Sequence, residues 1–238
     1  NKKSFENLIL AGGFDSFEHT HRAQYLNSDG DGITFLEKIM RFGNKFQEHL
    51  NSSQISLFGE ETDNSYQDLT IPPCDPWSNL IRLKKEKEVV GIYISSHPLD
   101  DFEHEMNHFV SISLNQLTNL ESFINREVTV GGIVNEIEHF ESRQGRGWAR
   151  FSIEDFTDQF EFRIFGEEYL KYRHFLVVNQ FIRIKIMIRQ GWTNSETGRV
   201  GSPRVQFLNF EMLHNTIEKN AKKLILQLDI KKINEKKI

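Results

Sequence analysis

The sequence contains little cysteine and no long apolar run. Cys74 is the only cysteine among 238 residues, which excludes a disulfide within the chain and a thiolate zinc site and is typical of a reducing, cytosolic compartment. No segment reaches the roughly 18 apolar residues of a membrane-spanning helix, and no signal peptide opens the chain. We therefore expect a cytoplasmic protein without membrane contact. Because Asn1 is not a methionine and already lies in a helical pattern, we also expect a fragment of a longer protein.

Basic residues are in the minority, since 29 Lys and Arg stand against 34 Asp and Glu, a net charge of −5. Taken alone, this balance argues against nucleic-acid binding. The charge is unevenly distributed, however. Residues 1–124 contain 10 basic and 19 acidic side chains (10 − 19 = −9), whereas residues 125–238 contain 19 and 15 (19 − 15 = +4). The second half could therefore approach phosphate, whereas the first half, as a whole, would not be attracted to it.

Apolar residues in the first half recur with a helical period. The spacing predicts helices over residues 4–10, 33–50 and 86–94, the last of them broken by His97-Pro98. Residues 51–76 have no such period and contain Pro72, Pro73 and Pro76, which is typical of an exposed linker. We expect a helical part over 1–50, a linker over 51–76 and a helical connector over 77–124.

The second half alternates between apolar and polar residues, as strands do. Strands are predicted over 128–137, 148–153, 160–165, 181–189 and 205–213, with a helix over 167–176 between the third and the fourth. Gly131-Gly132 in the first strand suggests a bulge or a bend. Five strands with a helix in this position are the order of an OB-fold barrel, predicted over 125–214. The fold class is therefore α+β with several domains, and residues 215–238 are expected to begin a truncated further domain or to form a tail.

The predicted barrel carries basic and aromatic residues where OB folds bind their ligands. The binding face of an OB fold lies on strands two and three, between the loop after strand one and the loop between strands four and five. The candidates for nucleic-acid binding are Arg143, Arg146, Trp148, Arg150, Arg163, Lys185, Trp192 and Arg199. Cations that follow phosphates, together with rings that stack on bases, suit single strands. The alternative is a solvated barrel surface with Trp148 packed on a neighbouring domain.

A short motif lies in the predicted linker. In the segment 54–58, Gln54 is followed after two spacer residues by Leu57 and Phe58. An extended peptide of this kind can place its two apolar side chains in a pocket while the glutamine hydrogen-bonds at the rim. The alternative is a loop that buries Leu57 and Phe58 in its own domain.

Four features in this order resemble the C-terminal part of the bacterial DNA polymerase III alpha subunits. They are LILAGGFD at 8–15, QISLFG at 54–59, EKEVVGIYISSHPL at 86–99 and the OB-like pattern, with Ser96 departing from the family's usual glycine. The resemblance implies that the first segment closes a helix-hairpin-helix region that holds duplex DNA. It implies that Gln54, Leu57 and Phe58 bind the sliding clamp, and that the barrel meets the single-stranded template during replication. Other replisome subunits are then expected partners.

Other constellations are too incomplete to predict chemistry. The sequence Asp29-Gly30-Asp31-Gly32 fails as a calcium loop at later positions. His104 and His108 are more typical of a solvated helix face, and Ser95-Ser96-His97 lacks an orienting acid. By resemblance, the family's catalytic aspartates lie upstream of this segment, so we predict no catalytic residue, metal or cofactor here. The competing hypothesis is a protein-interaction module in which the barrel binds another replisome subunit, with Trp148 and Trp192 as anchors.

Overall fold

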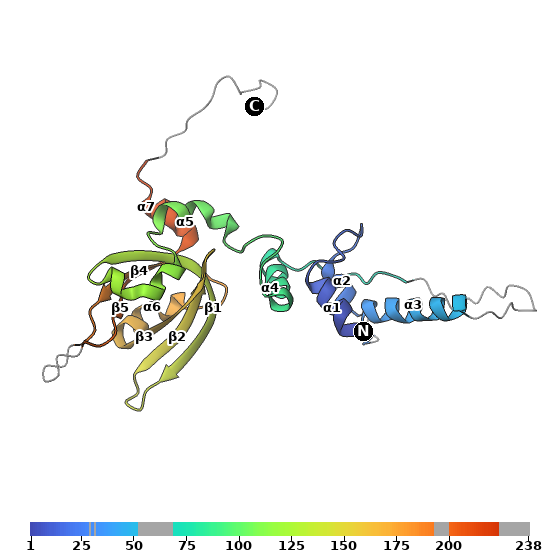
Figure 1. The fold of residues 1–238 in the computed structure, drawn as a ribbon, viewed down its shortest axis with the longest axis horizontal. Helices are drawn as coiled ribbons and strands as arrows, with labels where there is room; N and C mark the ends of the chain where they lie inside the picture. The colour runs from blue at the N-terminus through green and yellow to red at the C-terminus, as the bar shows by residue number, and fades with distance from the viewer. Residues whose placement is uncertain (29, 31, 52–68, 193–199, 224–238) are drawn as a thin grey trace, which may run out of the picture. The chain divides into compact units, whose positions relative to one another are not determined.

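The computed structural model describes residues 1–28, 30, 32–51, 69–192 and 200–223, which fall into two compact units, Asn1–Pro98 and Leu99–Ile238 (Figure 1). The predicted clamp-binding residues Gln54, Leu57 and Phe58 lie outside the described residues, as does Arg199. Among the described helices, none is both long enough and apolar enough to cross a membrane.

The first unit, here called the helical unit, contains four helices in its described residues. These are α1 (Lys2–Leu10), α2 (Arg22–Leu26), α3 (Phe35–Asn51) and α4 (Asn79–Val90). Ile9, Tyr25, Phe35 and Leu36 form its buried core. The helices predicted near 4–10 and 33–50 are therefore confirmed.

The predicted bounds of the third helix are wrong. Helix α4 begins at Asn79, because the hydroxyl of Ser78 accepts the N–H of Ile81 and caps it, and it ends at Gly91, which adopts φ +88°. The stretch after Gly91, predicted as helix, is a turn. Its backbone N–H groups at Ile94 and Ser95 donate to the carboxylate of Glu86 instead of continuing the helix.

The second unit, here called the OB unit, contains five strands in one antiparallel sheet over the part of it that the structure describes. They are β1 (Glu127–Glu141), β2 (Gly147–Glu154), β3 (Gln159–Phe165), β4 (Phe181–Arg189) and β5 (Arg204–Met212), in the order β3-β2-β1-β4-β5. Helices precede, interrupt and follow the strands: η1 (Asp100–Phe102), α5 (Glu103–Phe109), η2 (Leu114–Phe123), α6 (Gly166–Tyr172), η3 (Arg173–Phe175), η4 (Leu213–Asn215) and α7 (Thr216–Asn220). This is the predicted OB fold, with α6 between β3 and β4 (Figure 1).

The core of the OB unit follows from the alternation in the sequence. In β4 the four isoleucines, Ile182 to Ile188 at every second position, are fully buried, while Arg183 and Lys185 between them face outward. Phe151 and Phe162 pack between the strands with ring centroids 5.4 Å apart. The strands are therefore held by a continuous apolar interior, and their outward residues are left to make the surface.

Of the bulge or bend predicted at the glycine pair of β1, the structure does not place a bulge there. The irregularity in the pairing of β1 with β2 lies between Val134 and Glu136. A Cβ at Gly132 would collide with the carbonyl oxygen of Glu154. Gly132 is thus needed because the backbone of β2 approaches it closely.

Candidate nucleic-acid interface

Three aromatic rings stack across the outward face of β1, β2 and β3. Phe140 and Trp148 are direct cross-strand neighbours, as are Trp148 and Phe165. Their ring centroids are 4.3 and 5.3 Å apart, with interplanar angles of 17° and 20°. The exposed fraction is 37% for Phe140 and 56% for Phe165. We call these three residues the aromatic ladder.

Local sequence dictates why the ladder faces outward. Ala149 and Ile164, the neighbours of Trp148 and Phe165, are fully buried in the core, so the alternation of the strand turns both rings to the other face. The sequence analysis named only Trp148. The same alternation, continued by one residue past Ile164, would have identified Phe165. Phe140 is recognised only through its pairing with Trp148.

A tight loop with two free cations lies next to the ladder. The backbone N–H of Ser142 donates to the carbonyl oxygen of Arg146 at 2.9 Å, and Gly145, at φ +72°, makes the turn between β1 and β2. Arg143 and Arg146 are exposed, and neither forms an ion pair with a described residue. A shallow groove of about 330 Å³ runs from this loop to the ladder; its lining includes Arg146, Trp148 and Phe165. The loop thus places positive charge beside the rings.

The other predicted arginines of this face are neutralised by carboxylates. Nη2 of Arg150 lies 2.6 Å from Oε2 of Glu138, and Nη2 of Arg163 lies 3.3 Å from Oε1 of Glu161. The hydrogen bond that Arg150 donates to Glu138 raises the pKa of Arg150. Because each arginine has its own carboxylate, this part of the face is less positive than the sequence analysis expects.

The remaining two described candidates lie elsewhere in the OB unit. Lys185 pairs with Glu127 at 2.5 Å and faces Thr129 on β1, eleven residues before Phe140 (140 − 129 = 11), so it does not adjoin the ladder. Trp192 follows β4 directly and is 61% exposed. The structure therefore brings together Arg143, Arg146, Trp148, Arg150 and Arg163, but not Lys185.

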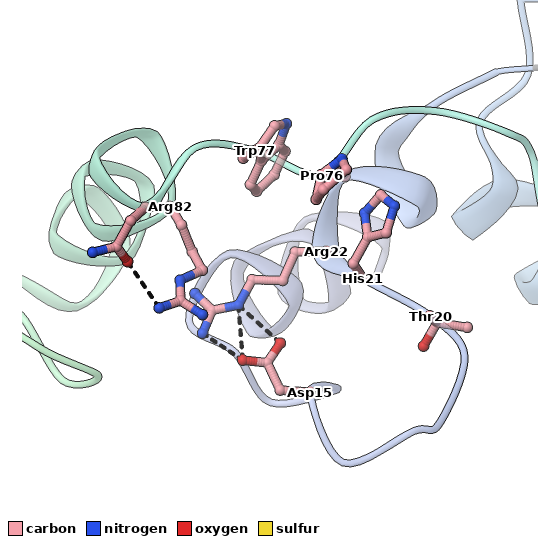
Figure 2. Close-up of a pocket in the computed structure, with 9 residues that line it drawn as sticks. Asp15, Thr20, His21, Arg22, Pro76, Trp77 and Arg82 are labelled. Atoms are coloured by element: carbon pink, nitrogen blue, oxygen red, sulfur yellow. Dashed lines mark hydrogen bonds and ion pairs between the residues drawn. The ribbon is translucent and has the colours of Figure 1, made fainter. Parts of the chain in front are cut away.

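A second concave site lies in the helical unit. Figure 2 shows this pocket, whose volume is about 470 Å³. Its lining comes from the stretch before α2, from the N-terminal half of α2, from the segment before α4 and from the first turn of α4. The residues are Asp15, Thr20, His21, Arg22, Ala23, Pro76, Trp77, Asn79 and Arg82.

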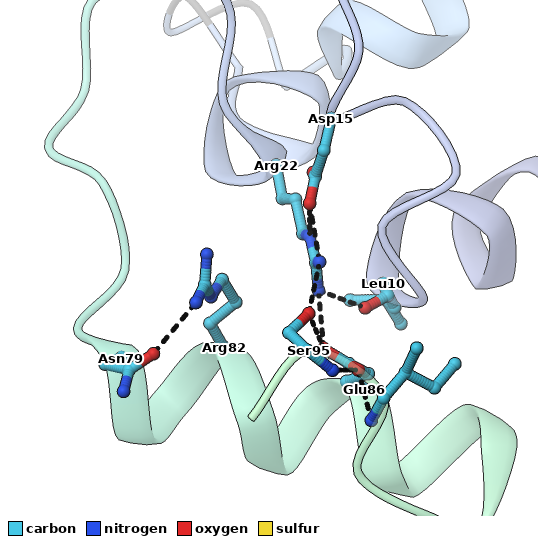
Figure 3. A network of polar contacts seen from close by, with 8 residues as sticks. Leu10, Asp15, Arg22, Asn79, Arg82, Glu86 and Ser95 are labelled. Atoms are coloured by element: carbon cyan, nitrogen blue, oxygen red, sulfur yellow. Dashed lines mark hydrogen bonds and ion pairs between the residues drawn. The ribbon is translucent and has the colours of Figure 1, made fainter. Parts of the chain in front are cut away.

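A buried ion pair next to this pocket ties α2 to α4. Arg22, 5% exposed, donates to Asp15 at 2.6 Å, to the carbonyl of Leu10 at 2.9 Å and to Glu86 at 3.3 Å (Figure 3). Glu86 is fully buried and also accepts the hydroxyl of Ser95 at 2.8 Å. The sequence analysis missed both residues.

The protonation of Glu86 is set by opposing effects. Burial by itself raises the pKa of a carboxyl group. The hydrogen bonds from Ser95, from the N–H of Ile94 and from Arg22 outweigh this effect and hold the pKa of Glu86 below its ordinary value. Glu86 is therefore ionised at neutral pH. Since the hydroxyl of Ser95 is committed to Glu86, the segment Ser95-Ser96-His97 holds no free nucleophile at Ser95.

The described residues give little support for a metal site or for a reactive thiol. Among those residues no three His, Cys, Asp or Glu side chains gather as metal ligands do. His104 and His108 lie side by side, with ring centroids 4.4 Å apart, but only as a pair. Burial, with a contribution from Asp75, raises the pKa of the Cys74 thiol, so the reactive thiolate is disfavoured.

Sequence comparison relates this chain to much longer proteins. No model of a protein family matches it. The DNA polymerase III subunit alpha of Mycobacterium tuberculosis is 30% identical over 178 residues, covering 72% of this chain and 14% of that protein. The subunit of Saccharopolyspora erythraea is 28% identical over 193 residues, covering 80% and 16%, and that of Treponema pallidum is 29% identical over 165 residues, covering 69% and 13%. The chain thus spans about a seventh of these relatives.

Comparison with solved structures gives weak similarities. The second OB-fold domain of replication protein A from Methanococcus maripaludis is 14% identical, covers 43% of this chain and 91% of that domain, and has a TM-score of 0.24. A small single-stranded DNA-binding protein from Streptomyces coelicolor is 10% identical, covers 37% and 94%, and has a TM-score of 0.20.

Proposed function

Since the chain belongs to the family of DNA polymerase III alpha subunits and corresponds to a C-terminal part of them, we propose that it is a non-catalytic region that serves chromosomal DNA replication in the cytoplasm, at the nucleoid. In this proposal the OB unit binds the single-stranded template. The observation that carries it is the aromatic ladder of Phe140, Trp148 and Phe165 on the outward face of β1 to β3.

The rings of the ladder can stack on any base, whatever the nucleotide sequence. Every base has a π-face, and stacking on a protein ring contributes about 1–3 kcal/mol per base. Because the three rings already stack on one another, bases are expected against the exposed surfaces of the outer two, Phe140 and Phe165. Arg143 and Arg146 then contact the phosphates that flank those bases. The paired Arg150 and Arg163 contribute less, since binding a phosphate there requires release of a carboxylate.

The salt dependence of binding tests this assignment. Each phosphate contact to a single strand adds about 0.7 to the slope of log K against log salt. Replacing Arg143 and Arg146 together by alanine should therefore lower the slope by about 1.4. Fluorescence anisotropy with a labelled oligothymidylate measures it. Arg150→Ala is the matched control, with a smaller expected change. An unchanged slope in the double variant contradicts the phosphate contacts, and absence of binding by the wild type contradicts the proposed function.

We further propose that Gln54, Leu57 and Phe58 tether the chain to the sliding clamp. The support is the motif itself, its place in the order of segments shared with the family, and its apolar pair in a proline-rich stretch. The relation of residues 1–50 to a helix-hairpin-helix region stays a prediction.

The variant Leu57→Ala plus Phe58→Ala tests the clamp motif. Anchor side chains at protein interfaces contribute about 2 kcal/mol or more, so at least a thirtyfold loss of clamp affinity is expected. Surface plasmon resonance on immobilised clamp measures it, and Ser56→Ala, at a spacer position, is the control with unchanged binding. Equal binding by the double variant and the control would contradict the assignment of the clamp-binding motif.

One observation favours a second candidate, a protein-interaction module for the OB unit. Glu138 and Glu161 neutralise Arg150 and Arg163, and exposed rings such as Trp192 also anchor protein interfaces. Under this alternative the OB unit binds another replisome subunit. Ring substitutions would then abolish capture of that subunit, while the oligothymidylate would bind neither the wild type nor the variants.

A further inference from the structure

Two buried nitrogen atoms at the pocket of the helical unit have no hydrogen-bond partner among the described residues. They are Nδ1 of His21 and Nε of Arg82. Both residues line the same pocket but come from different elements. His21 lies just before α2, and Arg82 is on α4 (Figure 2). Buried polar atoms in native proteins are nearly always paired, and an unpaired one points to a bound ion, water or ligand. Two in one pocket point to a ligand-binding site.

The lining cation that this pocket offers to a ligand is Arg82. Nη2 of Arg82 donates to Oδ1 of Asn79 at 2.9 Å, but no described carboxylate forms an ion pair with this arginine (Figure 3). Arg22, by contrast, contacts two carboxylates, Asp15 and Glu86, so these three groups together carry a formal charge of −1, and the attraction for an anion has to come from other cations. The ammonium group of Lys85 lies 4.8 Å from the ring centre of Trp77, another lining residue. The pocket therefore favours an anion.

The hydrogen bond of His21 limits which anions can pair with its second ring nitrogen. Nε2 of His21 lies 3.1 Å from the carbonyl oxygen of Cys74, which can only accept, so Nε2 carries a proton. Nδ1 is then an acceptor in the neutral ring and a donor in the imidazolium. A phosphate monoester satisfies both forms, because it titrates near pH 6 and presents either a hydroxyl or an oxyanion, whereas a backbone phosphodiester is always an oxyanion and pairs only with the imidazolium.

We propose that this pocket binds a phosphate group. Arg82 donates to it through Nε, His21 pairs with it through Nδ1, and the amide of Asn79 lies beside Arg82. Donors from two elements approach from different directions, which a tetrahedral oxyanion matches better than a planar carboxylate does. Pro76 and Trp77 form the apolar wall for the organic part of the ligand. The phosphate belongs either to a free monoester or to a nucleic-acid backbone, and this site is independent of the OB unit.

The test uses the whole chain and follows the side-chain NMR signals of Arg82 Nε–H and of the Trp77 indole. Inorganic phosphate is the first probe, and saturable shifts of both signals are expected. Arg82→Gln should weaken the affinity at least tenfold, as expected for a charge-assisted hydrogen bond. Arg41→Gln, an exposed arginine on α3, is the matched control and should leave it unchanged. Asn79→Ala, which removes the partner of Arg82, should weaken it by a smaller factor.

Further probes distinguish the sources of the phosphate. If thymidine monophosphate shifts the same signals and a DNA duplex does not, the ligand is a free monoester. If the duplex or a single strand shifts them and inorganic phosphate competes, the ligand is a backbone phosphate. Shifts that never saturate, or equal affinities for Arg82→Gln and Arg41→Gln, would overturn the proposal, provided that the amide spectra show both variants folded.

Discussion

Alanine at both Trp148 and Phe165 is expected to weaken binding of single-stranded DNA by about 5- to 150-fold for each base that loses its ring, which corresponds to about 1–3 kcal/mol per base. The two residues form the centre and the more exposed end of the aromatic ladder, so their removal leaves Phe140 without a stacking partner. The loss of affinity should be similar for different DNA homopolymers and should differ only as far as their bases differ in stacking strength. Anisotropy titrations at one fixed salt concentration measure it.

The position of each ring allows a matched control. Phe165 is 56% exposed, so Phe165→Ala alone removes one ring with little effect on the core. Leu170→Ala, on α6 and 62% exposed, removes an apolar side chain of the same unit away from the ladder and should bind like the wild type. If Phe165→Ala and the double variant bind as tightly as Leu170→Ala, the ladder does not stack on DNA. Binding of a protein partner would then be the better explanation of the exposed rings.

Glu86→Ala is expected to destabilise the helical unit by about 3–5 kcal/mol, the usual cost of removing one partner of a buried ion pair. Four hydrogen bonds meet at this fully buried carboxylate: those from Ile94 N–H, Ser95 N–H, the hydroxyl of Ser95 and Arg22. Their loss leaves buried donors unpaired, and the turn after α4 is then no longer held to the helix by Glu86. Hydrogen–deuterium exchange in increasing urea measures the free energy of unfolding for peptides from residues 1–98.

The OB unit and a neighbouring glutamate serve as controls for this prediction. Peptides from residues 99–223 should exchange as in the wild type, and Glu88→Ala, at an exposed position of the same helix, should change little. The pKa of Glu86 lies below its ordinary value. Its stabilising contribution is therefore present above the unfolded pKa, about 4.3, and lost as the pH falls through the lower folded pKa. Glu86→Gln should lack this pH dependence, and a wild type equally stable through acid pH would contradict the ionised pair.

The strands of the OB unit could be predicted closely because they obey a simple rule, although the sheet they form is open where a barrel was predicted. In β4, isoleucine at every second residue specifies the buried face, and the predicted range 181–189 agrees with Phe181–Arg189 in the structure. The predicted bounds of α4 failed for a local reason. The apolar period continues to Ile94, but the cap at Ser78 starts the helix earlier, and Gly91 ends it by adopting a positive φ. A period in the sequence cannot report where a backbone leaves the helical conformation.

The sequence by itself determined the elements of this protein, the OB order of its strands and its kinship with the DNA polymerase III alpha subunits. These depend on local periodicity and on short motifs, which can be recognised in the sequence itself. Tertiary structure alone decided which charges remain free and which side chains meet. It paired Arg150 with Glu138 across 12 residues, Arg22 with Glu86 across 64, and aligned Phe140, Trp148 and Phe165 from three strands. The physical reason is that electrostatic and stacking energies depend on distances in space, which the folding of the chain sets and the order of residues does not.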